Sequence, residues 1–307
     1  MGSSTLFPAA TSGAARLRQR LSEPGVLAAP GCYDALSVRI VEEAGFECAF
    51  LGGFSVAAGR LGLPDVGLMS YGEMVAQTAD VAAATSLPLI ADADTGYGNG
   101  VNAQRSLLGY ARAGAACVMI EDQAWPKRCG HTSGKEVVPR AEAIARVRAA
   151  AAVRDEHGLD ILLMARTDAV ATDGFDEALT RAVAFAEAGA DITFLEAPES
   201  EEQMARYCTE VPGAKTANLV EDGRTPWLTE ATLTDLGYSV VLYPVTMLLH
   251  SINAMQQAAQ GLRSGTSDSA ARVTFDDARA LVGWPEYEER STLYGTNPSR
   301  ATEEETR

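Results

Sequence analysis

The sequence lacks the features that would connect it to nucleic acid or to a membrane. Lys and Arg number 25 against 41 Asp and Glu, which gives a formal net charge of -16. No broad basic surface is therefore expected that could neutralise phosphates or anionic lipids. No apolar run approaches the roughly 20 residues of a membrane span, and the start lacks the apolar stretch of a secretory signal. We therefore expect neither nucleic acid nor membrane as a partner, and a cytoplasmic location.

Paired cysteine spacing is also missing. The five cysteines are scattered without a Cys-x-x-Cys motif, which is typical of reduced thiols rather than of a disulfide framework or a zinc site. Four of them are expected to be packing residues. The fifth, Cys129, is considered below.

An alternation of strands and helices runs along most of the chain. At 307 residues with 47% hydrophobic residues, the chain has the length typical of an α/β barrel, for which about 250 residues suffice. Short apolar or β-branched runs alternate with longer stretches of helical periodicity, as in repeated βα units. The expected strands are 26–29, 48–51, 87–91, 117–120, 161–165, 192–195, 214–217 and 240–243. Expected helices include 101–113, 140–154 and 175–188.

Three helix-to-strand joints read AGFECAF, AGAACVM and AGADITF, each with a glycine where a helix C-cap needs a left-handed residue. The repeated pattern favours a (β/α)8 TIM barrel with a C-terminal helical arm. An open doubly wound sheet is the alternative, because local pattern alone does not show closure. The predicted domains are 1–263, the barrel with an N-terminal helix, and 264–307, a helical arm with a helix at 275–282 and an acidic tail.

Polar or glycine-rich groups follow every expected strand. The carboxyl ends of parallel barrel strands share one face, where such barrels build their active sites. These groups should therefore form a ring. Its members are Tyr33-Asp34, Gly52-Gly53-Phe54-Ser55, Asp92 and Asp94, Glu121-Asp122, Arg166, Glu196, Asn218 and Tyr243-Pro244.

Three of these acids predict a metal site. Asp92 and Asp94 are two residues apart on an extended segment, so both carboxylates point to one side, with Glu121 on the neighbouring strand. An all-oxygen set with no histidine or cysteine suits a hard cation, Mg2+ in the first place with Mn2+ as a substitute. The alternative is that the aspartates cap a helix or shape a glycine turn.

The segment after Glu121 places cations around a thiol. Lys127, Arg128 and His131 surround Cys129, and nearby positive charge lowers a thiol pKa and makes it a better acid or base. Gly130 and Gly134 are candidate hinges of a closing loop. The alternative is an ordinary exposed basic loop.

Taken together, these motifs resemble the isocitrate lyase and phosphoenolpyruvate mutase superfamily, from about Leu17 to Leu262. The central match is KRCGH at 127–131. It is accompanied by DADTGYGN (92–99), IEDQ (120–123), PGCYDALSVRI (30–40), GLPDVGL (62–68), ARTDA (165–169), FLEAPES (194–200), ANLVEDGRTPWLT (217–229) and the Tyr-Pro pair at 243–244.

The resemblance implies a Mg2+-dependent enzyme that breaks a carbon–carbon bond in a small anionic carboxylic acid. It further implies a homotetramer with exchanged C-terminal helices. Asp92, Asp94 and Glu121 would hold the metal. Arg166 and the backbone at Gly52, Gly53 and Phe54 would grip the 2-oxo-acid end, while Asp65, His131, Glu196 and Asn218 would line the rest. The loop carrying Lys127 and His131 would close over the substrate. Cys129 would protonate the departing carbon, Arg166 would stabilise the developing anion, and Tyr33 is the candidate base.

Several family members remain open. The cysteine loop argues against phosphoenolpyruvate mutases and phosphonopyruvate hydrolases, and isocitrate lyases are longer. A lyase of the 2-methylisocitrate or 2,3-dimethylmalate type is favoured over an oxaloacetate hydrolase, a carboxyphosphonoenolpyruvate mutase and a non-catalytic barrel. Val220 precedes Glu221 where 2-methylisocitrate lyases usually have threonine, so a dicarboxylate is favoured over a tricarboxylate. Thr246 leaves the hydrolase open.

Overall fold

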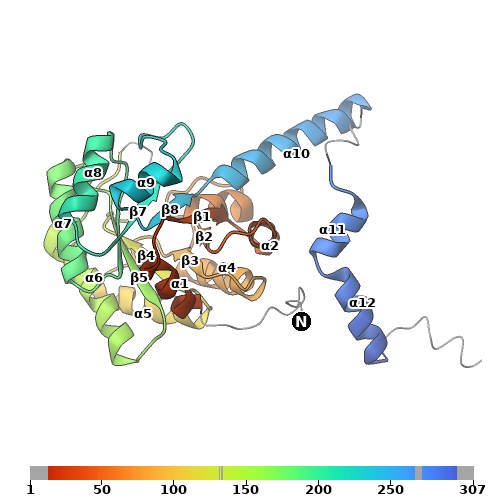
Figure 1. The fold of residues 1–307 in the computed structure, drawn as a ribbon, viewed down its shortest axis with the longest axis horizontal. Helices are drawn as coiled ribbons and strands as arrows, with labels where there is room; N and C mark the ends of the chain where they lie inside the picture. Colours follow the sequence, from red (N-terminus) through yellow and green to blue (C-terminus); the bar gives the residue numbers. More distant parts are fainter. Residues whose placement is uncertain (1–12, 131, 133, 267–271, 296–307) are drawn as a thin grey trace, which may run out of the picture. The chain divides into compact units, whose positions relative to one another are not determined.

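The computed structural model describes residues 13–130, 132, 134–266 and 272–295 (Figure 1). Over this range the chain divides into two compact units, and the first ends at Ser251 while the second begins at Ile252. This division falls within a single helix, α10 (Thr246–Ser264). The domain boundary expected after residue 263 stays a prediction.

The first unit is a closed barrel of eight parallel strands in sequence order (Figure 1). Closure is direct, because β1 pairs with β2 on one side and with β8 on the other, through Leu27–Val240 to Pro30–Tyr243. The predicted (β/α)8 barrel is confirmed, and the open doubly wound sheet is excluded. The strands are β1 (Leu27–Cys32), β2 (Ala49–Leu51), β3 (Leu89–Asp92), β4 (Cys117–Glu121), β5 (Leu162–Thr167), β6 (Ile192–Leu195), β7 (Ala214–Asn218) and β8 (Val240–Tyr243).

Helices connect and surround the strands (Figure 1). Their starts follow the sequence: Ser70 and Glu73 form a reciprocal capping box at α4, and Asn99 caps α5. The glycines of the three repeated joints, Gly45, Gly114 and Gly189, all have positive φ, as predicted. The helices of this unit are α1 (Gly13–Ser22), α2 (Ala35–Glu43), α3 (Gly53–Val56), the π-helix η1 (Ala57–Leu61), α4 (Tyr71–Ala83), α5 (Gly100–Arg112), α6 (Arg140–Glu156), the 3-10 helix η2 (Ala169–Ala171), α7 (Phe175–Glu187), α8 (Glu201–Glu210), α9 (Glu230–Leu236) and the first part of α10.

Strand residues alternate between two apolar layers. Phe50, Met119 and Met164 belong to one buried cluster, which also contains Leu17 of α1. Their sequence neighbours Leu51, Val118 and Leu163 pack with α2, α4, α5 and α6 in a second cluster. This period of two fills the barrel interior and attaches the helices outside, so the strand ends are held rigidly.

The second unit contains the rest of α10, α11 (Phe275–Leu281) and α12 (Trp284–Leu293). The helix predicted at 275–282 is present. Helix α12 was not predicted, since its sequence was interpreted as polar tail. The predicted acidic tail lies mainly at 296–307, outside the described residues. No helix in the described ranges is both long and apolar enough to cross a membrane.

Candidate active site

A cavity of ≈ 280 Å³ opens at the carboxyl ends of the strands. Its walls contain most of the predicted site residues, which come from strands far apart in sequence. These are Gly52, Gly53, Phe54, Asp65, Asp92, Glu121, Lys127, Cys129, Arg166, Glu196 and Asn218. The barrel therefore brings the predicted ring together on one face, as its topology requires.

The three predicted metal ligands are held together by main-chain hydrogen bonds. The carboxylate of Asp92 accepts from the amides of Asp94 (2.9 Å) and Gly53 (3.0 Å). The Glu121 amide donates to the Asp94 carbonyl at 2.8 Å, and Asp94 itself has a left-handed φ of 48°. All three side chains are buried. The Gly53 amide, expected to grip the substrate, is thus directed at Asp92.

Burial outweighs the nearby positive charges at Asp94 and Glu121. Burial raises the pKa of Asp94 to about 6, with Lys127 opposing the rise. Burial likewise raises the pKa of Glu121 well above its usual value, against the effect of Arg166. Glu121 Oε1 is buried without a hydrogen-bond partner, and Asp94 Oδ1 is buried 2.7 Å from Lys127 Nζ. Buried carboxylate oxygens of this kind fit a hard cation.

Among the described residues, no group of three or more Asp, Glu, His and Cys side chains is arranged to hold a metal by itself. Mg2+ commonly keeps several waters and takes one or two protein carboxylates besides substrate oxygens.

Lys127 connects the cysteine loop to this acidic cluster. Its buried Nζ lies 2.6 Å from Asp65 Oδ1 and 2.7 Å from Asp94 Oδ1, the second contact being an ion pair without hydrogen-bond geometry. Burial alone would lower the pKa of Lys127. The larger combined effect of Asp94 and the other nearby acids raises this pKa well above its usual value. Lys127 is therefore a fixed cation at the edge of the cavity.

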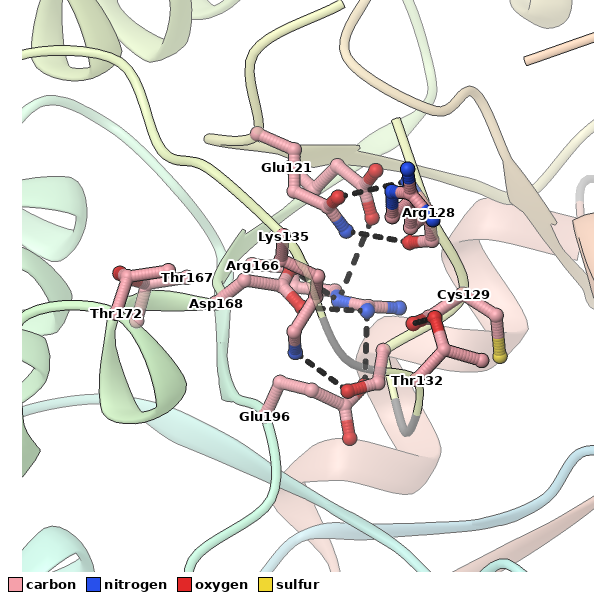
Figure 2. A network of polar contacts seen from close by, with 12 residues as sticks. Glu121, Arg128, Cys129, Thr132, Lys135, Arg166, Thr167, Asp168, Thr172 and Glu196 are labelled. Atoms are coloured by element: carbon pink, nitrogen blue, oxygen red, sulfur yellow. Dashed lines mark hydrogen bonds and ion pairs between the residues drawn. The ribbon is translucent and has the colours of Figure 1, made fainter. Parts of the chain in front are cut away.

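Arg166 sits at the centre of a buried polar network (Figure 2). Its Nε and Nη2 donate to the two oxygens of Asp168, each at 2.9 Å. Nη2 also lies 3.0 Å from Glu196 Oε2, and Nε 3.5 Å from Glu121 Oε2. The Asn218 amide in turn donates to Glu196 at 3.3 Å. The guanidinium is thereby held in one orientation, facing the cavity.

The described part of the cysteine loop (127–130, 132 and 134–135) is seated directly on this network. A side chain at Gly130 would place its Cβ 2.3 Å from Arg166 Nη2, so only glycine fits there. Gln123 holds the start of the loop, because its side chain accepts from the Arg128 amide (2.9 Å) and donates to the Arg128 carbonyl (2.8 Å). Cys129 lines the cavity. His131, also predicted here, lies outside the described residues.

Two residues of the network were not predicted as site residues. Asp168 and Lys135 are buried and joined by a 2.8 Å contact. Burial raises the pKa of Asp168, but Arg166 and Lys135 outweigh it and lower the pKa below its usual value. Asp168 lies within the matched segment 165–169, and Lys135 follows the KRCGH motif by four residues, but only the fold shows their contact.

Tyr33 is placed differently from the other predicted residues. It is not among the residues that line the cavity, and its hydroxyl donates to Ser251 Oγ at 3.0 Å. The structure therefore does not bring the candidate base to the acids and Cys129.

Six apolar side chains also line the cavity. Phe50, Phe194 and Leu242 come from the strands, and Val220, Val245 and Leu249 from the segments after β7 and β8. Glu221 also lines the cavity, and the Thr246 hydroxyl donates to it. These apolar side chains could contact alkyl substituents of a substrate.

With this geometry established, comparison with known proteins identifies the class. The chain belongs to the phosphoenolpyruvate phosphomutase family, whose model matches residues 17–263. The family is part of the PEP mutase/isocitrate lyase superfamily, as the sequence motifs indicated.

Particular relatives cover nearly the whole chain. A 2,3-dimethylmalate lyase of Eubacterium barkeri is 41% identical over 92% of this chain and 98% of its own length. A chloroplastic carboxyvinyl-carboxyphosphonate phosphorylmutase of Arabidopsis thaliana is 39% identical over 90% and 84%. A 2-methylisocitrate lyase of Aeropyrum pernix is 35% identical over 89% and 88%.

Solved structures agree. An oxaloacetate acetylhydrolase in complex with the inhibitor 3,3-difluorooxalacetate superposes with a TM-score of 0.89 at 33% identity, over 92% of this chain and 97% of that one. A 2,3-dimethylmalate lyase gives 0.87 at 33%, over 94% and 97%. A phosphonopyruvate hydrolase solved with oxalate and Mg2+ gives 0.81 at 28%, over 92% and 99%.

Proposed function

We propose that the protein is a carbon–carbon lyase, dependent on Mg2+ or Mn2+, that cleaves a 2-hydroxy dicarboxylate of the 2,3-dimethylmalate type to a 2-oxo acid such as pyruvate and a second carboxylate. The observation that carries this proposal is the convergence of Cys129, Arg166, Asp92 and Glu121 on one cavity. Relatives named as lyases, at 35–41% identity over most of the chain, support it.

Each group has a defined part in the reaction. The metal, held by Asp92, Asp94 and Glu121 with water and substrate oxygens, would supply Lewis-acid polarisation at the 2-oxygen. Arg166 holds the carboxylate beside that oxygen and faces the negative charge that develops there. Lys127 keeps the acids from repelling an anionic substrate.

Proton movement completes the cleavage. The 2-hydroxyl gives its proton to a base, for which Tyr33 is the candidate from the sequence, C2 becomes a carbonyl carbon, and the electron pair of the C2–C3 bond stays on C3 as an enolate. Cys129 donates its thiol proton to C3, which releases the second carboxylate. Tyr33 stays only a predicted base, since it does not line the cavity.

The apolar side chains of the cavity support the choice of substrate. Val220 offers no hydrogen-bond donor to a third carboxylate, whereas the valine and leucine side chains around it can contact methyl groups. A dicarboxylate with alkyl substituents is therefore favoured over 2-methylisocitrate. An oxaloacetate hydrolase is the second candidate, because one such structure is a close neighbour. The Thr246 hydroxyl is engaged with Glu221, which favours the lyase.

Release of 2-oxo acid from a substrate panel tests the proposal. We expect pyruvate from 2,3-dimethylmalate with Mg2+ and none with EDTA, and a smaller kcat/KM for 2-methylisocitrate. Val220→Thr should reduce the ratio of kcat/KM for 2,3-dimethylmalate to kcat/KM for 2-methylisocitrate by about tenfold, since a new hydrogen bond to a charged group contributes on the order of 1.5–3 kcal/mol. Val101→Thr, on the exposed surface of α5, is the matched control.

Other outcomes have clear meanings. Oxalate and acetate from oxaloacetate, without cleavage of the malates, would assign the protein as a hydrolase. If no acid in the panel were cleaved, the carboxyphosphonoenolpyruvate mutase and the non-catalytic barrel would be the functions left to test.

We further propose that the enzyme is a homotetramer with exchanged C-terminal helices. In the second unit, large apolar side chains are exposed, including Met255, Leu262, Phe275 and Leu293, and a surface of this kind is commonly covered by another chain. A cytoplasmic location is part of the same proposal, because the reaction needs Cys129 as a thiol and reducing compartments maintain thiols.

A further inference from the structure

We propose that Lys135 is a positioning residue for the reaction: it fixes the backbone next to Cys129 to the same carboxylate that orients Arg166. The proposal rests on the role of Cys129 in the proposed function, and it assigns Lys135 no contact with substrate. The carbon-protonating thiol and the carboxylate-binding guanidinium would then share one buried anchor.

The anchor is a two-way contact of the Lys135 ammonium. Nζ lies 2.8 Å from Asp168 Oδ1 and also donates to the Gly130 carbonyl, on the loop directly after Cys129. Lys135 and Asp168 are both buried. Hydrogen bonds that involve charged groups are about twice as strong as neutral ones, and burial reduces their screening. The loop is thus tied to the barrel by a strong, water-excluded contact.

The tie continues to the substrate-binding arginine (Figure 2). Asp168 uses both oxygens to hold Arg166, and each oxygen accepts at 2.9 Å. Arg166 Nη2 lies directly beside Gly130, where a Cβ would come within 2.3 Å of it. Gly130 is therefore held at two points. Lys135 binds its carbonyl, and Arg166 lies against its Cα. A displacement of Lys135 must move the residue that follows Cys129.

The residue type also fits this role. The chain has only three lysines, at positions 127, 135 and 215, among 25 basic residues. Lys127 and Lys135 are buried at the site, and only Lys215 is partly exposed. An ammonium donates in three directions from one small centre and can join a carbonyl to a carboxylate, whereas a guanidinium is a larger planar fork.

Accessibility of Cys129 measures the position of its loop without any assumption about the substrate. We would treat the full-length enzyme with iodoacetamide and follow each cysteine by peptide mass spectrometry, with and without oxalate and Mg2+. Lys135→Met removes the tie, and Lys135→Gln keeps a neutral donor. Lys215→Met is the matched control, because Lys215 also donates to a loop carbonyl, that of Gly213, at 2.8 Å and outside the cavity.

We expect alkylation of Cys129 to rise about tenfold in Lys135→Met and less in Lys135→Gln, since the loss of one charged hydrogen bond has about that effect on an equilibrium. Lys215→Met should match the wild type. The buried Cys32, Cys48 and Cys117 should stay protected in every variant. On 2,3-dimethylmalate, kcat should fall about tenfold or more with a smaller change in KM, because Arg166 keeps its contacts with Asp168 and Glu196.

Unchanged alkylation of Cys129 in a folded Lys135→Met would overturn the proposal. Equal alkylation of Cys32, Cys48 and Cys117 would show general unfolding of Lys135→Met. In that case the folded Lys135→Gln variant decides, and unchanged alkylation of Cys129 in it overturns the proposal. Absence of turnover in the wild type would count against the proposed function alone, since the alkylation pattern still decides the role of Lys135.

Discussion

Main-chain groups, as much as other side chains, fix the individual functional residues. Both carboxylate oxygens of Asp92 accept hydrogen bonds from backbone amides. The Gln123 side chain binds both the amide and the carbonyl of Arg128. Side chains held in this way have little freedom to adapt. Substitution at a residue that does chemistry should therefore reduce turnover without a large change in the free energy of unfolding.

Cys129→Ser is the direct test of the proposed acid. Serine is nearly the same size but a far weaker acid than a thiol, so we expect kcat to fall about 100-fold or more. Cys208→Ser is the matched control: Cys208 is also partly exposed but packs near Tyr238, away from the cavity. Release of pyruvate under saturating Mg2+ measures both. Full activity of Cys129→Ser would remove the thiol from the mechanism.

The raised pKa of Asp94 predicts how the effect of Mg2+ on stability depends on pH. Burial raises its pKa from 3.8 to about 6, so the folded protein binds this proton more tightly than the unfolded chain does. Without metal, this group stabilises the fold below about pH 3.8, and the stabilisation is lost as the pH rises through 6. A cation replaces the proton. Mg2+ should therefore raise the melting temperature at pH 7.5 and have little effect at pH 5.

Melting curves with and without Mg2+ at pH 5, 6 and 7.5 measure this dependence. Asp94→Asn should melt at a higher temperature than wild type at pH 7.5 without metal and should lose the response to Mg2+. A Mg2+ shift that stayed constant from pH 5 to 7.5 would show that Asp94 does not hold the cation.

At the scale of elements, the cysteine loop and the barrel strands meet at Gly130. Gly130→Ala should push the loop away, because the new methyl group would overlap Arg166 Nη2 and Glu196 Oε2. Misplacement of a reacting group by about 1 Å can cost about 100-fold in rate, and we expect a loss of that order in kcat. Gly72→Ala in α4, where nothing lies within 4 Å of the new methyl, is the control. Equal activity of the two variants would contradict the seating of the loop.

Elements are also where the sequence was most informative. All eight strands were predicted to within a few residues, because most are short apolar runs followed by a polar group. Helix α12 was missed because its apolar side chains, among them Trp284 and Leu293, are exposed and give no inward-facing stripe. The division between the two units falls within α10, so no turn or linker in the sequence marks it.

Some site residues could be predicted from the sequence and others could not. Residues that follow a strand directly, such as Asp92 and Arg166, could be predicted from position alone. Lys135 and Asp168 could not, since their importance comes from a contact across 33 positions. Tyr33 follows β1 as the others follow their strands, yet its side chain turns to Ser251, which no local pattern reveals.

At the scale of the whole molecule, the proposed tetramer makes a prediction about the second unit. Phe275 is 78% exposed at the start of α11. Phe275→Asp leaves that helix intact, since an acid suits its first turn, but it places a charge on an apolar surface. The wild type should have a mass close to that of four 32.3-kDa chains, and the variant a smaller one by light scattering.

Val101→Asp, at a side chain 72% exposed in the first turn of α5, is the control for added charge. It should keep the mass of the wild type. A wild-type protein that scattered as a single chain would refute the assembly, although not the chemistry of the cavity.

The cavity wall draws residues from the ends of strands β2 to β8, nearly the full circumference of the barrel. A ligand that bridges these ends is bound only while the barrel is closed. Its binding energy is therefore shared by all the strands rather than by one segment. Amide hydrogens in strands as far apart in the chain as β3 and β8 should then exchange more slowly together when oxalate and Mg2+ are added, as one cooperative unit.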